Sequence, residues 1–236
     1  MKIALIGYGK MGKAIDAIAT AKGHEIVLRT SSQHPLTKEQ LAGVDVAIEF
    51  TVPETAYQNI ITCFEANVPV VSGTTGWLDK LPAIKVLCEE KKQAFLHTTN
   101  FSIGVNIFFE VNKKLAELMA HQPQYNVWME EIHHTQKKDA PSGTALSLAE
   151  QVMSSVTRKT KWVNEESNQP DTLSIISKRI DPAPGTHIIS YTSAIDDITI
   201  THTAHSREGF AAGAVVAAEW LKGKTGVFTM REVLGL

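Results

Sequence analysis

The sequence predicts an α/β protein, in which a Rossmann-like, doubly wound parallel sheet is joined to a smaller α+β domain with an open mixed sheet. Through about the first hundred residues, short apolar runs alternate with segments of helical periodicity, which is typical of parallel strands linked by right-handed crossovers. A glycine-rich loop directly follows the first apolar run. Farther along, segments rich in Ile, Thr and Tyr follow one another without helices between them, which indicates a second sheet of different character.

The expected elements fall into two domains. In the first part we expect strands at residues 2–6, 25–28, 44–50, 68–72 and 95–98, and helices at 11–22, 55–67 and 81–92. In the second part we expect helices at 105–120 and 143–156, and strands at 126–134, 174–179, 187–192 and 197–204. An alanine-rich helix at 209–221 should pack back on the first sheet. The expected domains are residues 1–104 with 208–236, and residues 105–207.

The composition is that of an ordinary globular protein and excludes several kinds of partner. Of 236 residues, 43% are hydrophobic and 20% are charged, and a net charge of -2 offers no basic excess for nucleic acid. Cys63 and Cys88 lie far apart and form no CxxC motif, so we expect reduced thiols in a reducing compartment. We find no signal-peptide pattern and no apolar stretch long enough to span a bilayer. We therefore expect a cytoplasmic protein that binds neither nucleic acid nor membrane.

The loop after the first strand has the GxGxxG spacing of dinucleotide-binding sites. It follows an expected strand and opens an expected helix, which is the context that gives the motif its meaning. Glycines allow a tight turn and a close approach of the backbone to a pyrophosphate, while the helix N-terminus supplies free N–H groups. A tight turn without a ligand is the alternative, but the alternating α/β context favours a dinucleotide. The candidate cofactor residues in this loop are Gly7, Tyr8, Gly9, Lys10, Met11 and Gly12.

The end of the second strand bears on the choice of cofactor. NAD-preferring sites usually carry an acid about twenty residues after the loop, which holds the ribose 2′-hydroxyl. Here residues 28–32 contain no acid, and Arg29, Ser31 and Ser32 could instead donate hydrogen bonds to a 2′-phosphate. We therefore expect NADPH to be used at least as well as NADH. The alternative is that Arg29 is simply an exposed residue at the end of the strand.

Two further segments follow strands, at the edge where open α/β sheets bind ligands. Both are rich in small and hydroxyl-bearing residues that could line a nicotinamide, although each taken alone is only a good turn sequence. Their candidate cofactor residues are Gly73, Thr74 and Thr75, and Thr98, Thr99, Asn100 and Phe101.

Residues 131–145 concentrate groups for acid–base chemistry and anion binding. Two histidines and two lysines lie just before a helix start, and the strand must end or bend near the histidines if both serve one pocket. Ser142 is the expected N-cap, which leaves the next two amides pointing outward to receive a carboxylate. A capped helix preceded by a polar, solvated loop is the alternative. The candidate residues are His133, His134, Lys137, Ser142, Gly143 and Thr144.

This stretch resembles the signature of the dihydrodipicolinate reductase family, His-His-x-x-Lys-x-Asp-Ala-Pro-Ser-Gly-Thr-Ala, and every fixed position of that core is present. The resemblance covers nearly the whole chain, with its motifs in the right order. The other matching parts are the GxGxxG loop and residues 49–54, 72–76, 100–106 and 201–207.

The resemblance implies an NAD(P)H-dependent enzyme that reduces a cyclic dicarboxylate, 4-hydroxy-tetrahydrodipicolinate, on the route to diaminopimelate and lysine. It implies that the first domain binds NADPH or NADH, and that the middle domain binds substrate and carries the sheet used to form a homotetramer. His133 corresponds to the family's proton donor, and Lys137 to the lysine that contacts substrate and assists protonation. His134, Gly143 and Thr144 correspond to substrate-binding positions.

Some points stay open in the sequence. Residues 180–187 look shortened relative to the family, which bears on the subunit interface, and Arg207 could face a substrate carboxylate or solvent. His202 and His205, together with the pair His133 and His134, could suggest a metal site, but no carboxylate or cysteine is placed to complete one, so we expect none. If the protein were a different small Rossmann reductase, the His-His-x-x-Lys cluster would have no explanation. A non-catalytic NAD(P)-sensing regulator would lose the proton-transfer residues, which this sequence retains.

Overall fold

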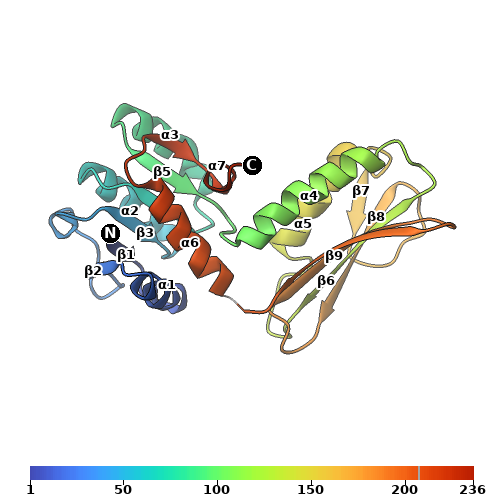
Figure 1. The fold of residues 1–236 in the computed structure, drawn as a ribbon, viewed down its shortest axis with the longest axis horizontal. Helices are drawn as coiled ribbons and strands as arrows, with labels where there is room; N and C mark the ends of the chain where they lie inside the picture. Colours follow the sequence, from blue (N-terminus) through green and yellow to red (C-terminus); the bar gives the residue numbers. More distant parts are fainter. Residues whose placement is uncertain (207) are drawn as a thin grey trace. The chain divides into compact units, whose positions relative to one another are not determined.

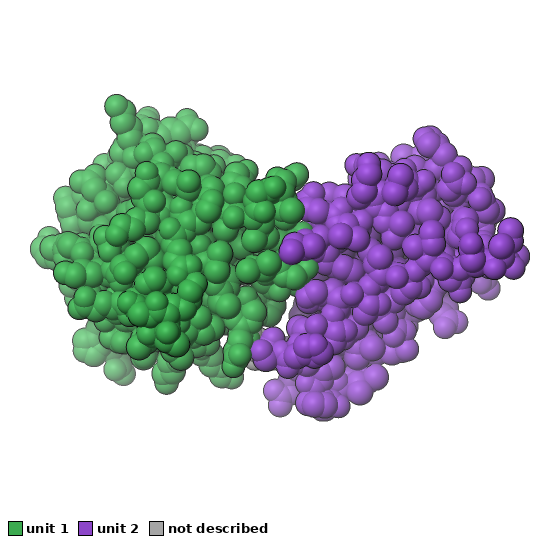
Figure 2. Space-filling model, viewed as in Figure 1, with its two compact units in different colours: residues 1–106, 208–236 green, residues 107–207 purple. Residues whose placement is uncertain are grey.

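The computed structural model describes residues 1–206 and 208–236, and the chain divides into two compact units (Figure 1 and Figure 2). Unit 1 comprises Met1–Asn106 and Glu208–Leu236, and unit 2 comprises Ile107–Arg207. Arg207, a candidate for contact with a substrate carboxylate, lies outside the described residues. In the part of the chain that the structure describes, no helix combines the length and the apolar character needed to cross a membrane.

Unit 1 is built on a six-stranded parallel sheet in the order β11-β5-β4-β3-β1-β2. Its central strands are buried runs of aliphatic residues, as expected of parallel strands that helices cover on both faces. The predicted Rossmann-like sheet is therefore confirmed. The strands are β1 (Lys2–Ile6), β2 (Glu25–Arg29), β3 (Val46–Glu49), β4 (Val70–Ser72), β5 (Ala94–His97) and β11 (Gly226–Phe228).

Helices form a separate hydrophobic core on each face of this sheet. On one face Ile15 and Ala19 pack with Ile3 and Leu5, and the alanine-rich helix that returns from unit 2 joins them, as the sequence predicts. On the other face an aromatic and aliphatic core surrounds Phe64. The first core contains α1 (Lys10–Ala21), α6 (Glu208–Leu221) and α7 (Met230–Leu234), and the second contains α2 (Pro53–Glu65) and α3 (Leu81–Glu90).

Unit 2 is a five-stranded mixed sheet, in the order β10-β9-β6-β8-β7, with two helices on one face (Figure 1). The central strand β6 runs parallel to β8 and antiparallel to β9. Its alternate residues, among them Val127 and Met129, are buried under the helices. The elements are α4 (Ile103–Met119), β6 (Asn126–His133), α5 (Gly143–Ser155), β7 (Lys161–Val163), β8 (Thr172–Arg179), β9 (Gly185–Thr192) and β10 (Asp197–Ala204).

Several short elements were not predicted from the sequence. Strands β7 and β11 have three residues each, which is too few to show the alternation of apolar and polar residues that marks a strand. Each forms because it pairs with a longer neighbouring strand. Helix α7 does carry a local signal, since Thr229 and Glu232 form a capping box. Strand β6 ends at His133 instead of at residue 134, which meets the condition that the strand must end near the two histidines.

Candidate active site

The GxGxxG loop joins β1 to α1, and each of its three glycines occupies a different structural environment. Gly7 has a φ of +95°, and a Cβ at Gly12 would lie only 2.2 Å from the carbonyl oxygen of Gly7. At Gly9, by contrast, no described atom lies within 4 Å of the place where a Cβ would stand. Gly9 is the N-cap of α1, and no side chain in the described part of the chain caps its first turn. The first amides of the helix are therefore available to a pyrophosphate.

A pocket of about 410 Å³ lies beside this loop. The fully buried carboxylate of Glu49 organises the neighbouring strand ends, because it accepts hydrogen bonds from Ser72 Oγ at 2.6 Å and Thr74 Oγ1 at 2.8 Å. Register explains the contact, since Glu49 of β3 lies beside Ser72 of β4. The structure thus brings two predicted cofactor segments together around residues Gly9, Lys10, Met11, Phe50, Thr51, Pro53, Gly73, Thr74 and Thr75.

The segment after β5 lies at the same edge of the sheet, because His97 at its end pairs with Ser72. Thr98 and Asn100 bond to each other, through Thr98 Oγ1 to the Asn100 carbonyl at 3.1 Å and the Asn100 amide to Thr98 Oγ1 at 3.2 Å. Asn100 and Phe101 are buried, whereas Thr99 is exposed. Of these four candidates, Thr98 and Thr99 are therefore the side chains most open to a ligand.

Arg29, the candidate for a 2′-phosphate, is already paired with an acid that the sequence reading missed. Its Nε lies 2.6 Å from Asp16 Oδ2, and its guanidinium carbon lies 5.6 Å from the centroid of the Tyr8 ring. Tyr8 donates a hydrogen bond to the same carboxylate oxygen at 2.7 Å. The hydrogen bond from Arg29 lowers the pKa of the Asp16 carboxyl. Asp16 lies in α1, so a search at the end of β2 does not find it.

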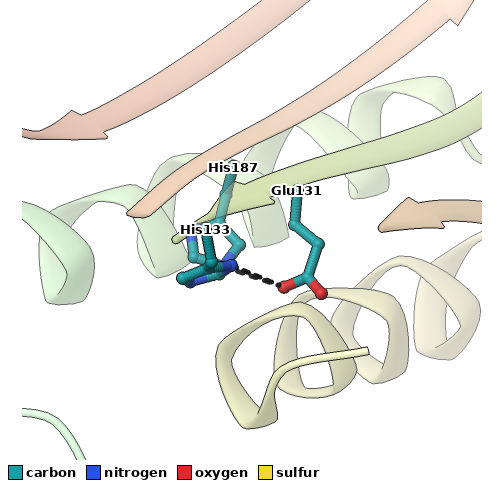
Figure 3. A group of neighbouring side chains, drawn as sticks. All are labelled: Glu131, His133 and His187. Atoms are coloured by element: carbon teal, nitrogen blue, oxygen red, sulfur yellow. Dashed lines mark ion pairs between the residues drawn. The ribbon is translucent and has the colours of Figure 1, made fainter. Parts of the chain in front are cut away.

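The side chains of the chemical site come together through strand register. Glu131 and His133 are two residues apart on β6, so their side chains share the face that α5 covers. The register places Ser177 of β8 and His187 of β9 beside Glu131, and Arg179 of β8 beside His133. Figure 3 shows the Glu131 carboxylate and the His133 ring directed toward each other, with His187 next to them.

Glu131 is fully buried and extensively bonded. Its Oε1 accepts hydrogen bonds from the Ser142 amide at 3.0 Å, Ser177 Oγ at 2.8 Å and Arg179 Nη2 at 3.2 Å. Its Oε2 lies 3.3 Å from His133 Nδ1. Burial alone would raise the pKa of this carboxyl, but the serine hydrogen bonds and the charge of His133 hold the pKa below its usual value. Burial lowers the pKa of His133, and Glu131 opposes that shift.

Ser142 is the N-cap of α5, as the sequence predicts, and its side chain faces inward. Its Oγ accepts a hydrogen bond from the Ala145 amide at 3.2 Å and lies 3.2 Å from His187 Nε2. Because this hydroxyl is buried and already bonded, the groups that α5 can offer to a substrate are the amides of exposed Gly143 and half-buried Thr144.

The loop after β6 carries the candidate lysine. Lys137 Nζ lies 2.8 Å and 2.9 Å from the two carboxylate oxygens of Asp139, so its charge is countered within the loop. Arg179 fixes the loop, because its guanidinium donates to the carbonyl oxygens of Lys137 and Asp139. His134 follows the strand end and is half-buried.

Three residues that the structure places at the candidate site were not predicted from the sequence, for different reasons. Glu131 has a local signal, since it stands two residues before His133 on a strand. Arg179 and His187 have none, because only the pairing of β8 and β9 with β6 brings them to the site. Glu131, His133 and His187 each offer a ligand atom within 4.8 Å of the others, so a carboxylate does lie beside histidines, contrary to the reasoning from sequence.

Comparisons with known proteins agree over nearly the whole chain. The family profile described as "Dihydrodipicolinate reductase, N-terminus" matches residues 1–101, and the one described as "Dihydrodipicolinate reductase, C-terminus" matches residues 104–234. A Christiangramia forsetii protein named 4-hydroxy-tetrahydrodipicolinate reductase is 49% identical over 99% of this chain and 98% of its own length. A protein of the same name from Neisseria gonorrhoeae is 36% identical over 83% of this chain and 74% of its own length.

Solved structures support the fold. A dipicolinate-bound dihydrodipicolinate reductase from Paenisporosarcina sp. TG-14 has a TM-score of 0.76 at 24% identity, with 97% of each chain covered. An engineered D-amino acid dehydrogenase bound to NADP+ has a TM-score of 0.53 at 14% identity, covering 98% of this chain and 93% of its own. The resemblance read from the sequence, and with it the class of NAD(P)H-dependent reductase, is confirmed by the profiles and the curated relatives: the chain belongs to the dihydrodipicolinate reductase family.

Proposed function

We propose that this protein reduces 4-hydroxy-tetrahydrodipicolinate to tetrahydrodipicolinate with NADPH or NADH, in diaminopimelate and lysine biosynthesis. Its family and the names of its relatives support the reaction. The observation that carries the assignment of residues is the buried pair of Glu131 and His133, which lies near a lysine and a capped helix start.

The cofactor residues fit a nicotinamide dinucleotide. Bound NADPH or NADH supplies the hydride, and the protein binds and orients it. The uncapped amides after Gly9 would hold the pyrophosphate, and the pocket beside them is lined by Gly73, Thr74 and Thr75. Thr98 and Thr99 would complete the nicotinamide end at the neighbouring strand end.

The substrate has two carboxylates, and unit 2 offers two kinds of group to hold them. The amides of Gly143 and Thr144 at the start of α5 are a neutral anion site. Lys137 adds full charge, provided that the substrate carboxylate replaces Asp139 as its partner. His134 would lie within the same group of contacts. Together these groups orient the ring and offset negative charge that develops as it is reduced.

Reduction also requires a proton on the ring, beside the carbon that receives hydride. His133 is our proposed donor, since an imidazolium gives up a proton near neutral pH. Lys137 assists, because its positive charge lowers the pKa of His133 and so favours release of the proton. The same product forms whether the ring binds hydroxylated or already dehydrated.

The proposal also covers the oligomeric state of the protein and its place in the cell. We propose a homotetramer formed through the face of the unit 2 sheet opposite to α4 and α5, where Trp128, Ile176 and Ile188 are partly exposed. We propose that the enzyme acts in the cytoplasm, where its two buried free cysteines would stay reduced. Light scattering of the purified protein tests the first statement, since a monomer would contradict it.

The reaction is tested by following oxidation of NADPH and of NADH while a synthase generates the substrate from pyruvate and aspartate semialdehyde. The proposal predicts oxidation that depends on the synthase, with NADPH used at least as well as NADH. Protein that binds both cofactors but oxidises neither would contradict it and favour a regulator or a different substrate.

A further inference from the structure

The two oxygens of the Glu131 carboxylate have different surroundings. Three donors occupy Oε1, whereas Oε2 has no hydrogen-bond partner among the described residues. The nearest imidazole nitrogens are His133 Nδ1 at 3.3 Å, which is also buried without a partner, and His187 Nε2 at 3.7 Å. Burying a charged carboxylate is costly unless it is bonded, and the donors to Oε1 already hold the charge in place. The group is thus fixed so that its second oxygen points at the candidate proton donor.

The charge of Glu131 also raises the pKa of His187, but burial outweighs it. Burial lowers the pKa of His187 to about 4, so the ring is neutral at pH 7, and its Nε2 also lies beside Ser142 Oγ. The rings of His133 and His187 meet edge to face, with centroids 5.1 Å apart. His187 therefore packs against His133 as a neutral neighbour.

Charged groups from three directions face His133. Glu131 faces it from its own strand, Arg179 from β8, and Lys137 and Asp139 from the loop that follows β6. The two carboxylates favour the charged ring and the two cations oppose it. Glu131 is the one of these that is both fully buried and close to a ring nitrogen.

We propose that Glu131 is a positioning residue for proton transfer: a small turn of the His133 ring joins the two unpartnered atoms, so that Nδ1 donates a hydrogen bond to Oε2 and the Nε2 proton is left for the substrate. The inference rests on the proposed role of His133. A carboxylate only accepts, so Nδ1 carries hydrogen whether the ring is neutral or charged. The imidazolium gives its Nε2 proton to the ring carbon, stays neutral with hydrogen on Nδ1, and takes a solvent proton afterwards.

A glycine lies beside the other nitrogen of the ring. A Cβ at Gly185 would lie 3.1 Å from His133 Nε2, so a larger side chain at this position of β9 would press on the atom that releases the proton. Glu131 thus faces Nδ1 of the ring, while the absence of a side chain at Gly185 leaves room beside Nε2.

Glu131→Gln tests the proposal because the surroundings fix how the amide must lie. The Ser142 amide and the Arg179 guanidinium can only donate, so they require the amide oxygen at Oε1. The amide nitrogen then faces His133 Nδ1 and donates to it. The ring then carries its hydrogen on Nε2 and resists charging. We expect kcat to fall by about 10- to 100-fold while NADPH binding is unchanged. The basic limb of the kcat–pH profile should move to lower pH by about one unit, because losing the negative charge lowers the pKa of His133.

Glu130→Gln is the matched control. Glu130 is the preceding residue, on the opposite face of β6, and is paired with Lys178 at 2.6 Å. Loss of the Glu130 charge should leave the kcat–pH profile unchanged. A Glu131→Gln enzyme whose limb stays at the wild-type pH would overturn the proposal, whatever its kcat, since a purely structural role lowers activity without moving the limb.

A second measurement needs neither the variant nor turnover, so it separates failure of this inference from failure of the proposed reaction. The ¹⁵N chemical shifts of the imidazole rings in the wild-type protein report the tautomer of neutral His133. Hydrogen on Nδ1 supports the proposal, and hydrogen on Nε2 overturns it. Activity should also survive a chelator. Its loss would make Glu131 a metal ligand and overturn the positioning role, because His133 and His187 stand within ligand distance of it.

Discussion

The two candidate sites are built in different ways. The cofactor site of unit 1 consists mainly of backbone groups and small side chains at strand ends, and its buried Glu49 is satisfied by neutral hydroxyl and amide groups. The chemical site of unit 2 consists of charged and titratable side chains brought together across three strands and a loop. Binding a dinucleotide requires shape and open amides, whereas moving a proton requires groups whose pKa values their neighbours adjust.

This difference predicts that a change of shape should damage the first site, and a change of charge the second. Gly12→Ala should have the largest effect, because its Cβ would meet a backbone carbonyl at 2.2 Å that cannot turn away. We expect a loss of about 3 kcal/mol in stability, together with loss of NADPH binding. Thermal unfolding and cofactor titration measure both. A variant as stable as the wild type would show that the loop can rearrange.

Lys137→Ala should lower kcat/KM by about 10- to 100-fold, with kcat and substrate affinity both affected, because a charge-assisted hydrogen bond is lost. Lys138→Ala is the matched control, since Lys138 is the exposed neighbour in the same loop. Steady-state kinetics of the two variants measure both effects. Equal effects of both changes would mean that only the general charge of the loop matters.

Gly9→Ala and Gly143→Ala form a pair that compares the two helix starts. At neither position does any described atom lie within 4 Å of a new Cβ, so stability should not change. A methyl group would instead obstruct a ligand at the first amides. We expect about a fivefold rise in KM for NADPH from the first change and for the dicarboxylate from the second. If either variant raised the KM for NADPH and the KM for the dicarboxylate together, the two helix starts would not serve separate ligands.

Arg29→Ala should have the smallest effect. The arginine side chain is 43% exposed and already paired with Asp16, so its net attraction for a 2′-phosphate is small. We expect the ratio of kcat/KM for NADPH to that for NADH to fall by about threefold. Asp16→Asn should shift the same ratio in the opposite direction, by freeing the guanidinium. An unchanged ratio in both variants would assign Arg29 to the stability of the strand end.

The same difference explains what the sequence could predict. The parallel sheet, the GxGxxG loop and the Ser142 cap depend on residues close together in the chain, and their patterns are visible there. Asp16 was missed because it reaches Arg29 from a neighbouring helix. His187 and Arg179 were missed because a mixed sheet fixes its partners by register, which no local pattern specifies. The roles of His133 and Lys137 came from the family motif, and they stay predictions.

The most direct test of the division between the sites is a rapid-mixing experiment on His133→Ala with NADPH already bound, in which oxidation is followed after substrate is added. We expect wild-type affinity for NADPH and a single-turnover rate reduced by about 100-fold or more, since the proton donor is absent while the cofactor site is intact. A rate near that of the wild type would contradict the account, because the proton would then come from a group other than His133.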